Sequence, residues 1–320
     1  MGFYDVTALG ELLIDFTENG VSAQGNPLLE ANPGGAPCNV LAMLCRLGAK
    51  TAFIGKIGKD MFGNQLEQAL TETGIDTSGL KKDNQTHTTL AFVHTLADGD
   101  REFSFYRNPG ADRMLSIDDL EEDLIQNCTI FHYGSLSMTD EPCRSATKKA
   151  VQLAEAAHVL RSFDPNLREP LWHSLESARE QISYGMRHCD ILKISDNEIR
   201  WFTGCEDFDE GVLALQKEYQ IPLILLSMGK DGSRAYTKNG CRTEQAAFIQ
   251  EHTVETTGAG DTFGACALHY VLSHGWHDYN ETELKEMLTF ANAAASIVTT
   301  RKGALRVMPS KEEIENFLNQ

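Results

Sequence analysis

The feature that most constrains the fold is a regular alternation of short apolar runs with longer amphipathic segments. We expect strands at residues 5–10, 51–55, 129–133, 159–164, 191–194 and 223–227. We expect helices between and after them, at residues 37–47, 63–72, 141–158, 175–187, 210–219, 259–273 and 282–299. Alternation on this scale is typical of parallel strands joined by crossover helices. The sequence therefore predicts an α/β fold of three layers, with a mostly parallel central sheet flanked by helices.

Two segments interrupt the alternation. Residues 12–33 contain several Gly, Asn and Pro residues, which favour turns, and show no helical periodicity. Residues 89–96 and 101–106 resemble two strands joined by an Asp98-Gly99 hairpin turn. An inserted hairpin does not easily join a parallel sheet. We therefore expect a single catalytic domain over residues 1–320. In it, segments 12–33 and 87–113 form a small β-sheet lid.

The charge balance limits the possible partners. The chain has 28 Lys and Arg against 46 Asp and Glu, a formal net charge of −18. Binding to nucleic acid or to an anionic membrane requires a basic surface, so we expect neither partner. The eight cysteines are scattered, and neither a signal peptide nor a spanning apolar run is visible. These features predict reduced thiols and a cytoplasmic location.

The most informative motif is Thr256-Thr257-Gly258-Ala259-Gly260-Asp261, which precedes an apolar helical run. Glycines before a helix let a ligand approach the backbone, and the first helical N–H groups attract an anion. A carboxylate repels phosphate but is suited to accept a proton from a hydroxyl that attacks the phosphate. Asp261 is thus a candidate general base. The alternative is a tight turn in which Asp261 only favours the helix start.

Glycines and an amide also precede the first expected helix. Gly34 and Gly35 would allow a polyhydroxyl ligand to approach closely, and Asn39 offers two donors and one acceptor for its hydroxyls. The alternative is an ordinary glycine-rich turn.

Three further motifs follow expected strands, where α/β proteins bind their ligands. Arg168 could pair with a phosphate, or its segment could be a simple Asp-Pro-Asn turn. Glu198 could hold Mg²⁺ directly or through water, or could complete a capping box with Ser195. The run that contains Ser227, Gly229 and Gly232 suits a nucleotide phosphate or a turn.

Together these residues resemble the PfkB (ribokinase-like) carbohydrate kinases, and within that family the bacterial fructokinases. The resemblance covers nearly the whole chain. Residues 34–48 are similar to the N-terminal signature of the family and residues 256–261 to its specific C-terminal signature. Supporting similarity lies in residues 9–16, 103–112 and 164–168.

The resemblance implies ATP-dependent phosphorylation of D-fructose to fructose 6-phosphate with Mg²⁺, a ribokinase-like fold and a homodimer formed through the lid. It implies that Asp261 is the base and that Gly258, Ala259 and Gly260 form an amide anion hole. The sugar site implied consists of Asp15, Gly34, Gly35 and Asn39, with Arg107 and Arg168 as further residues. The implied nucleotide site consists of Lys193, Ser227, Gly229, Gly232, Asn292 and Gly303. The resemblance also implies that Glu198 and Glu255 lie near the metal ions.

The sequence departs from the family pattern at two positions. Glu255 stands where the family usually has Asp at a monovalent-cation site, which leaves K⁺ dependence open. Ser195 replaces the usual Asn of the N-x-x-E motif. Two alternatives to fructose phosphorylation remain: a family kinase for 2-keto-3-deoxygluconate, tagatose, ribose or a nucleoside, and a non-catalytic sugar-binding regulator.

Overall fold

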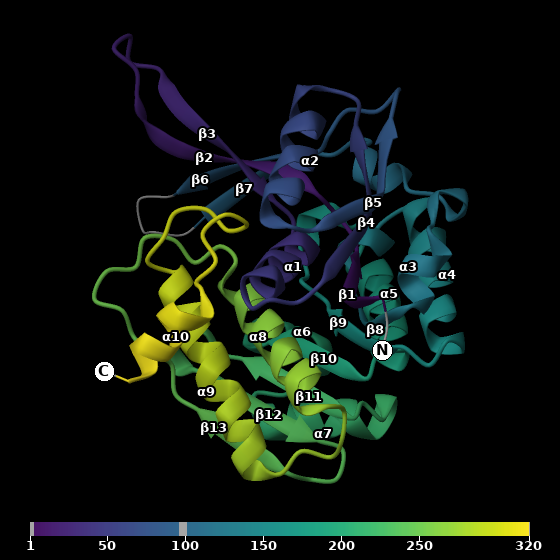
Figure 1. Ribbon diagram of the computed structural model, residues 1–320, viewed down its shortest axis with the longest axis vertical. Coiled ribbons are helices and arrows are strands. Elements are labelled where there is room, and N and C mark those ends of the chain that lie inside the picture. The colour runs from purple at the N-terminus through teal and green to yellow at the C-terminus, as the bar shows by residue number, and fades with distance from the viewer. Residues whose placement is uncertain (1–2, 96–100, 320) are drawn as a thin grey trace.

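The computed structural model describes residues 3–95 and 101–319 and has two β-sheets with helices on both faces of the larger one (Figure 1). In the larger sheet the strands run in the order β13-β12-β11-β10-β9-β8-β1-β4-β5. Adjacent strands from β5 to β11 pair in parallel, and β12 and β13 pair antiparallel at the far edge. The strands are β1 (Tyr4–Leu9), β4 (Thr51–Gly58), β5 (Asp76–Asp83), β8 (Cys128–Gly134), β9 (Leu160–Asp164), β10 (Ile191–Ser195), β11 (Leu223–Ser227), β12 (Ser233–Thr237) and β13 (Arg242–Gln245).

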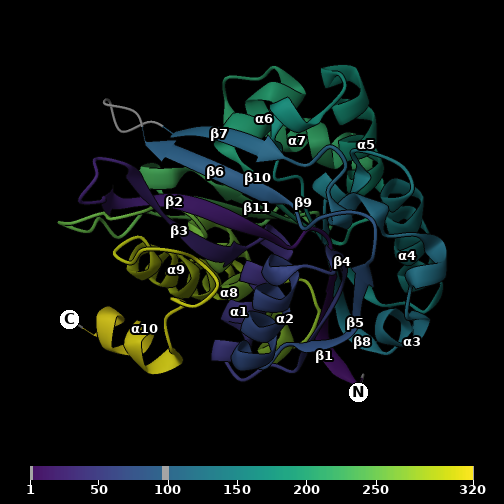
Figure 2. The same cartoon turned by 90° about the horizontal axis from the view of Figure 1, so that it is seen from above.

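The helices form two layers, one on each face of the larger sheet (Figure 2). One layer contains α1 (Ala36–Arg46), α2 (Met61–Thr73), α8 (Ala259–His274), α9 (Glu281–Val298) and α10 (Lys311–Leu318). The other contains α3 (Glu122–Gln126), α4 (Cys143–Ala156), α5 (Leu175–Arg187), α6 (Asp196–Thr203) and α7 (Phe208–Tyr219). Successive strand residues enter opposite layers, since side chains alternate along a strand. In β11, for example, Leu223 and Leu225 pack in the first layer and Ile224 and Leu226 in the second.

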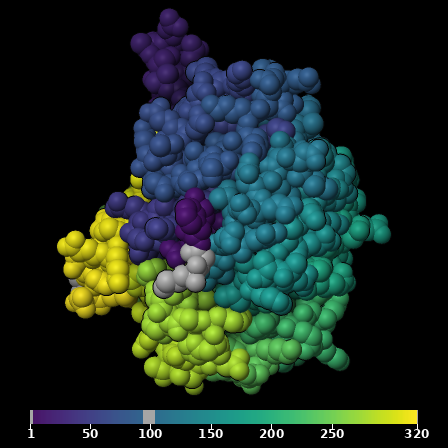
Figure 3. Space-filling view, turned by 45° about the vertical axis from the view of Figure 1, so that its right-hand side comes forward, coloured from purple at the N-terminus to yellow at the C-terminus, as the bar shows by residue number. Residues whose placement is uncertain are grey.

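The second sheet has the order β3-β2-β6-β7. Its strands are β2 (Leu13–Val21), β3 (Pro27–Gly34), β6 (Leu90–Thr95) and β7 (Arg101–Tyr106), and apart from Gly34 they lie within the two segments that interrupt the alternation. The β2–β3 hairpin extends beyond the body of the molecule, and Figure 3 shows its tip clear of the surface. The expected Asp98-Gly99 turn falls outside the described residues.

The expected layered α/β fold is confirmed, and so are the expected strands in its parallel core. Strands at the edges were missed, because an edge strand needs no continuous apolar run. In β5 the sequence is Asp-Thr-Ser-Gly-Leu-Lys-Lys-Asp, and β12 and β13 are four or five residues long. No helix within residues 3–95 and 101–319 combines the length and hydrophobicity needed to span a bilayer.

Close packing of α5 against β9 requires a glycine. A Cβ atom added to Gly185 would lie 2.3 Å from the Phe163 ring, and the Gly185 carbonyl accepts a hydrogen bond of 3.0 Å from Tyr133. Phe163 and Tyr133 are fully buried, so neither ring has room to move away.

We expect Gly185→Ala to destabilise the protein by about 2 kcal/mol, because overpacking of a rigid core outweighs the gain in helix propensity. Gly264→Ala in α8 is the matched control, since its added Cβ would make only an ordinary contact at 4.0 Å with Lys193. We expect this control to be neutral or stabilising by up to about 1 kcal/mol. Urea unfolding measures both variants, and equal stability of the two would contradict the packing argument.

Candidate active site

A polar cleft lies at the carboxyl ends of the central strands, under the second sheet. Its cavity volume is about 420 Å³. Residues at or just after the carboxyl ends of β1, β9, β10 and β11 line it, together with the first turns of α1 and α8. The chain order of the strands reverses between β1 and β8, and ligands of α/β sheets bind at such switch points.

The start of α8 forms one wall of the cleft. Gly258 caps the helix with a φ of 79°, a left-handed conformation that favours glycine. An added Cβ would also lie 2.9 Å from the Cβ atom of Ala304. The Ala259 amide donates to the Thr256 carbonyl at 3.2 Å, which differs from its expected place in an anion hole. The next two amides, of Gly260 and Asp261, have no intrahelical acceptor at these helix positions.

Asp261 lies in the first turn of α8, and its carboxylate is held from α1. The Asn39 side-chain amide donates to Asp261 Oδ2 at 2.8 Å. Burial raises the pKa of Asp261, while the Asn39 hydrogen bond and the Lys193 charge act in the opposite direction. The other amide atom, Asn39 Oδ1, is buried and has no hydrogen-bond partner among the residues the structure describes. The pair therefore presents a carboxylate and an unsatisfied acceptor at one place.

Lys193 supports this wall from beneath. Its Nζ atom lies 2.9 Å from Asp164 Oδ2, and the two side chains are 12% and 6% exposed. Gly260 has no side chain at this point; an added Cβ would lie 3.2 Å from Lys193 Nζ. Burial alone would lower the pKa of Lys193, but the carboxylates of Asp164, Glu198 and Asp261 raise it. Lys193 thus remains charged close to the first turn of α8.

The second sheet contributes Asp15, and the loop before α1 is shaped around it. A Cβ on Gly34 would lie 2.2 Å from Asp15 Oδ2, so a side chain there would displace the Asp15 carboxylate. Gly35 has a φ of 125°, and an added Cβ would lie 2.4 Å from the Glu11 carbonyl oxygen. Burial, with the charge of Glu255, raises the pKa of Asp15 to about 7, against the influence of Arg168. Arg168 also lines the cleft.

Glu11 is a cleft residue that the sequence analysis did not select. It follows β1, is 4% exposed, and its Oε1 atom accepts a hydrogen bond of 2.9 Å from the Ala36 amide. Burial raises the pKa of Glu11 to about 7, opposed by amide hydrogen bonds and by Arg107. Phe105, Asn166 and Thr257 also line the cleft and were not selected. Phe105 has no distinctive local pattern, whereas Asn166 and Thr257 stand within motifs from which other residues were selected.

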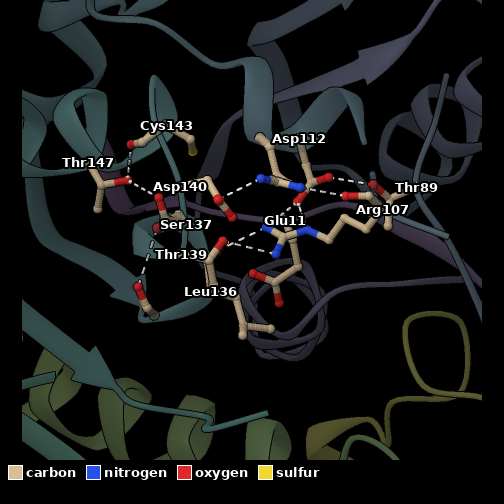
Figure 4. Close-up of polar contacts among 12 residues, drawn as sticks. Glu11, Thr89, Arg107, Asp112, Leu136, Ser137, Thr139, Asp140, Cys143 and Thr147 are labelled. Atoms are coloured by element: carbon tan, nitrogen blue, oxygen red, sulfur yellow. Dashed lines mark hydrogen bonds and ion pairs between the residues drawn. The ribbon is translucent and has the colours of Figure 1, made fainter. Parts of the chain in front are cut away.

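Arg107 does not line the cleft, although we expected it in the sugar site. Figure 4 shows its guanidinium between Asp112 and the loop after β8. It lies 2.6 Å from Asp112 Oδ2 and donates to the Leu136 carbonyl at 2.9 Å and to Thr139 at 3.1 Å. Thr89 also donates to Asp112. Asp112 therefore anchors both ends of the β6–β7 hairpin to the body of the protein.

Glu198 and Ser227 both line the cleft, as expected. Glu198 Oε2 accepts from the Ser195 amide and hydroxyl at 2.8 Å, which forms the capping box of α6. Glu198 Oε1 accepts from the Leu167 amide at 2.7 Å. The capping and ligand roles of Glu198 are compatible, because Oε1 accepts one hydrogen bond and keeps a second lone pair.

The remaining expected residues lie outside the lining of the cleft. Asn292 accepts a hydrogen bond of 2.8 Å from Ser233 and donates to the Gln245 and Ala246 carbonyls, so it ties α9 to β12 and β13. The Gly303 amide donates to Glu255 Oε2 at 2.9 Å. Gly229 and Gly232 flank the turn after β11. For these residues the sequence did not predict the hydrogen-bond partners that the structure shows.

Known proteins with similar sequences and structures are carbohydrate kinases. Residues 4–311 match the family described as pfkB family carbohydrate kinase. A probable fructokinase-2 of Arabidopsis thaliana is 43% identical over 316 residues, covering 98% of this chain and 95% of that protein. The ATP-bound fructokinase of Xylella fastidiosa aligns with a TM-score of 0.89 at 28% identity, over 99% of both chains. A Vibrio cholerae fructokinase with fructose, ADP and calcium bound aligns with a TM-score of 0.86 at 30% identity, over 98% of both chains.

The raised pKa of Asp15 predicts a pH-dependent stability. Its folded-state value of about 7 lies above the ordinary value. Folding therefore favours the protonated form, and this contribution is lost progressively as the pH rises from the ordinary value of 3.8 to about 7. We expect the stability of Asp15→Asn relative to the parent to be greater at pH 8.5 than at pH 5.5, by about 2 kcal/mol.

Urea unfolding at the two pH values measures this difference. Asp118→Asn, at an exposed position, is the control and should show no pH-dependent difference. A stability difference of the same size for Asp15→Asn at both pH values would contradict the assignment.

Proposed function

The chain belongs to the pfkB family of carbohydrate kinases, and on that premise we propose that it is a fructokinase that transfers the γ-phosphoryl group of ATP to O6 of D-fructose. The observation that carries the proposal is the Asn39–Asp261 contact at 2.8 Å, at the first turn of α8. It places a proton acceptor, a hydroxyl-binding amide and an anion-binding helix start together.

The sugar is held between the second sheet and α1. Asp15 accepts hydrogen bonds from sugar hydroxyls, and the unpaired Asn39 Oδ1 accepts another. Gly35 lets the sugar approach the backbone, and Arg168 adds a donor at the rim of the cleft. In this proposal Arg107 does not contact the sugar, because its guanidinium is bound to Asp112.

Asp261 acts as the general base. Because Asn39 donates to Oδ2, we assign Oδ1 as the atom that takes the O6 proton. The O6 atom then forms a bond to the γ-phosphorus as the bond to the β–γ bridging oxygen breaks, and ADP leaves. The amides of Gly260 and Asp261 face the charge on the transferred phosphoryl oxygens. Lys193 stabilises the carboxylate before it accepts the proton.

The nucleotide phosphates lie along Ser227, which lines the same cleft, and along the turn with Gly229 and Gly232. Within the described residues, no group of three or more His, Cys, Asp or Glu is placed to hold a metal ion. This fits Mg²⁺, which keeps several waters and binds mainly to substrate phosphates. Glu198 would hold it through water. When bound, Mg²⁺ neutralises charge on the β and γ oxygens.

The charge of the cleft favours a neutral sugar over a sugar acid such as 2-keto-3-deoxygluconate. Glu11, Asp15 and Asp261 contribute carboxylates, and Lys193 is already paired with Asp164. Arg168 would have to balance an additional substrate carboxylate. A regulator without activity is the less favoured alternative, since simple binding needs no buried base at a helix start.

We further propose a K⁺ site near Glu255, a homodimer through the second sheet acting as lid, and a cytoplasmic location. Glu255 organises the turn that contains Gly303. The strand register puts Leu29, Phe16, Phe92 and Tyr106 on one face of the sheet, and Tyr106 is 67% exposed there. The eight cysteines are unpaired, which suits a reducing compartment. Light scattering tests the dimer, and a monomer at micromolar concentration would contradict it.

The substrate assignment predicts the outcome of a sugar panel. We expect ADP release with Mg-ATP to be at least tenfold faster, in kcat/KM, with fructose than with tagatose, mannose, ribose, 2-keto-3-deoxygluconate or adenosine. Each sugar is tested with K⁺ and with Na⁺, and stimulation by K⁺ supports the Glu255 site. Faster turnover of another sugar would change the substrate but keep the mechanism. No turnover by a folded, sugar-binding protein would favour the regulator.

The role of Asp261 predicts a separate effect on kcat. We expect Asp261→Asn to lower kcat at least about a hundredfold with little change in fructose affinity, because the amide keeps the shape but cannot accept the proton. Steady-state kinetics and calorimetric titration measure the two quantities. A comparable kcat for variant and parent would rule out Asp261 as the base.

A further inference from the structure

We propose that Lys302 is a positioning residue that couples the sugar-binding arm to the catalytic helix. The arm is defined here as the β2–β3 hairpin, residues 13–34, which carries Asp15. The inference rests on the proposed kinase function and deepens it, because it states how closure over the sugar is linked to the nucleotide side of the cleft.

One end of the link joins the loop after α9 to both strands of the arm. Lys302 Nζ donates to the Glu18 carbonyl of β2 at 2.9 Å and lies 3.2 Å from Glu30 Oε2 of β3. Figures 1 and 2 both show the loop after α9, in yellow, beside the base of the arm. Glu18 lies three residues from Asp15 on the same strand, so the ammonium group contacts the element that places Asp15 in the cleft.

The other end of the link reaches the segment that leads into α8. The amide of Gly303, the next residue, donates to Glu255 Oε2 at 2.9 Å. The Val254 and Glu255 amides both donate to the Thr299 carbonyl, at 2.8 and 3.1 Å. Glu255 is followed directly by the motif that ends in Asp261. The turn at residues 299–303 is thus fixed to the chain that sets the start of α8.

These contacts connect two parts of the site through a short continuous path. A hairpin held by its strand hydrogen bonds moves as a unit, so Lys302 transmits the position of the arm to the turn. In the proposed kinase the nucleotide site includes Gly303 of this turn, and a nucleotide that orders the turn favours the arm position in which Asp15 meets the sugar. By the reciprocity of binding free energies, the sugar favours nucleotide binding equally.

Two simpler roles compete with this one. A direct nucleotide contact would need a free ammonium group, but the Lys302 group already donates to the Glu18 carbonyl and lies 3.2 Å from Glu30 Oε2. A purely stabilising surface ion pair is the second alternative. It would change the unfolding free energy without changing how one ligand affects the other.

The test measures the coupling itself. Fructose affinity of the full-length protein is titrated with and without a non-hydrolysable ATP analogue and Mg²⁺, for the parent and for Lys302→Met. We expect the analogue to lower the fructose Kd of the parent, and we call the ratio of the Kd values without and with the analogue the coupling factor. In Lys302→Met we expect this factor to be about fivefold smaller, which is the scale of an exposed ion pair and one charge-assisted hydrogen bond. Lys302→Arg should restore most of the factor.

Lys285→Met is the matched control. Lys285 Nζ also donates to a backbone carbonyl, that of Glu244, but away from the arm. We expect this variant to keep the parent factor. An unchanged factor in Lys302→Met overturns the inference. An equal loss of fructose affinity with and without the analogue also overturns it, because that result indicates a local contact only.

Amide hydrogen exchange in residues 13–34 provides a readout that needs no turnover and no sugar. The ATP analogue should slow exchange in the arm of the parent and of Lys285→Met, and should have little effect in Lys302→Met. Equal slowing in all three proteins would overturn the coupling even if the sugar panel confirms the kinase. Loss of slowing in Lys302→Met alone would support it even if the panel assigns a different sugar.

Discussion

The site depends on keeping one carboxylate, Asp261, buried at the start of a helix. Burial disfavours its charged form, so the surrounding structure must supply compensating donors and charge. Asn39 supplies a hydrogen bond from α1, Lys193 supplies a positive charge from β10, and the helix start supplies free amides. The glycine at 260 follows from this arrangement, because a side chain there would press on Lys193.

This arrangement requires segments far apart in the sequence. Asn39 and Asp261 are separated by 222 positions and meet because α1 and α8 lie side by side over the parallel sheet (Figure 2). The sheet aligns the ends of β9 and β10, which brings Asp164 next to Lys193. The second sheet then covers the same edge and adds Asp15. In the proposed mechanism this cover would close over the polar substrate and exclude water from the site.

The sequence predicted those parts of the fold that depend on local patterns. Buried parallel strands such as β11 have continuous apolar runs, and their positions were predicted almost to the residue. The edge strand β5 was missed because one side of it faces no neighbouring strand and its residues are mostly polar. The Gly258–Asp261 motif indicated an anion site at a helix start because glycine, helix dipole and carboxylate lie within four residues. Glu11 was missed because a lone glutamate after a strand has no such pattern.

By itself, the sequence determined the layered α/β fold, the two segments that leave it, and the glycines and carboxylate at the start of α8, since each is encoded by neighbouring residues. Only the tertiary structure decided the partners of individual side chains. It placed Arg107 against Asp112 rather than in the cleft, Asn292 between two carbonyls, and Lys302 on the arm. The physical reason is that a long polar side chain has several possible partners within reach along the sequence. Which of them it meets depends on how distant elements pack.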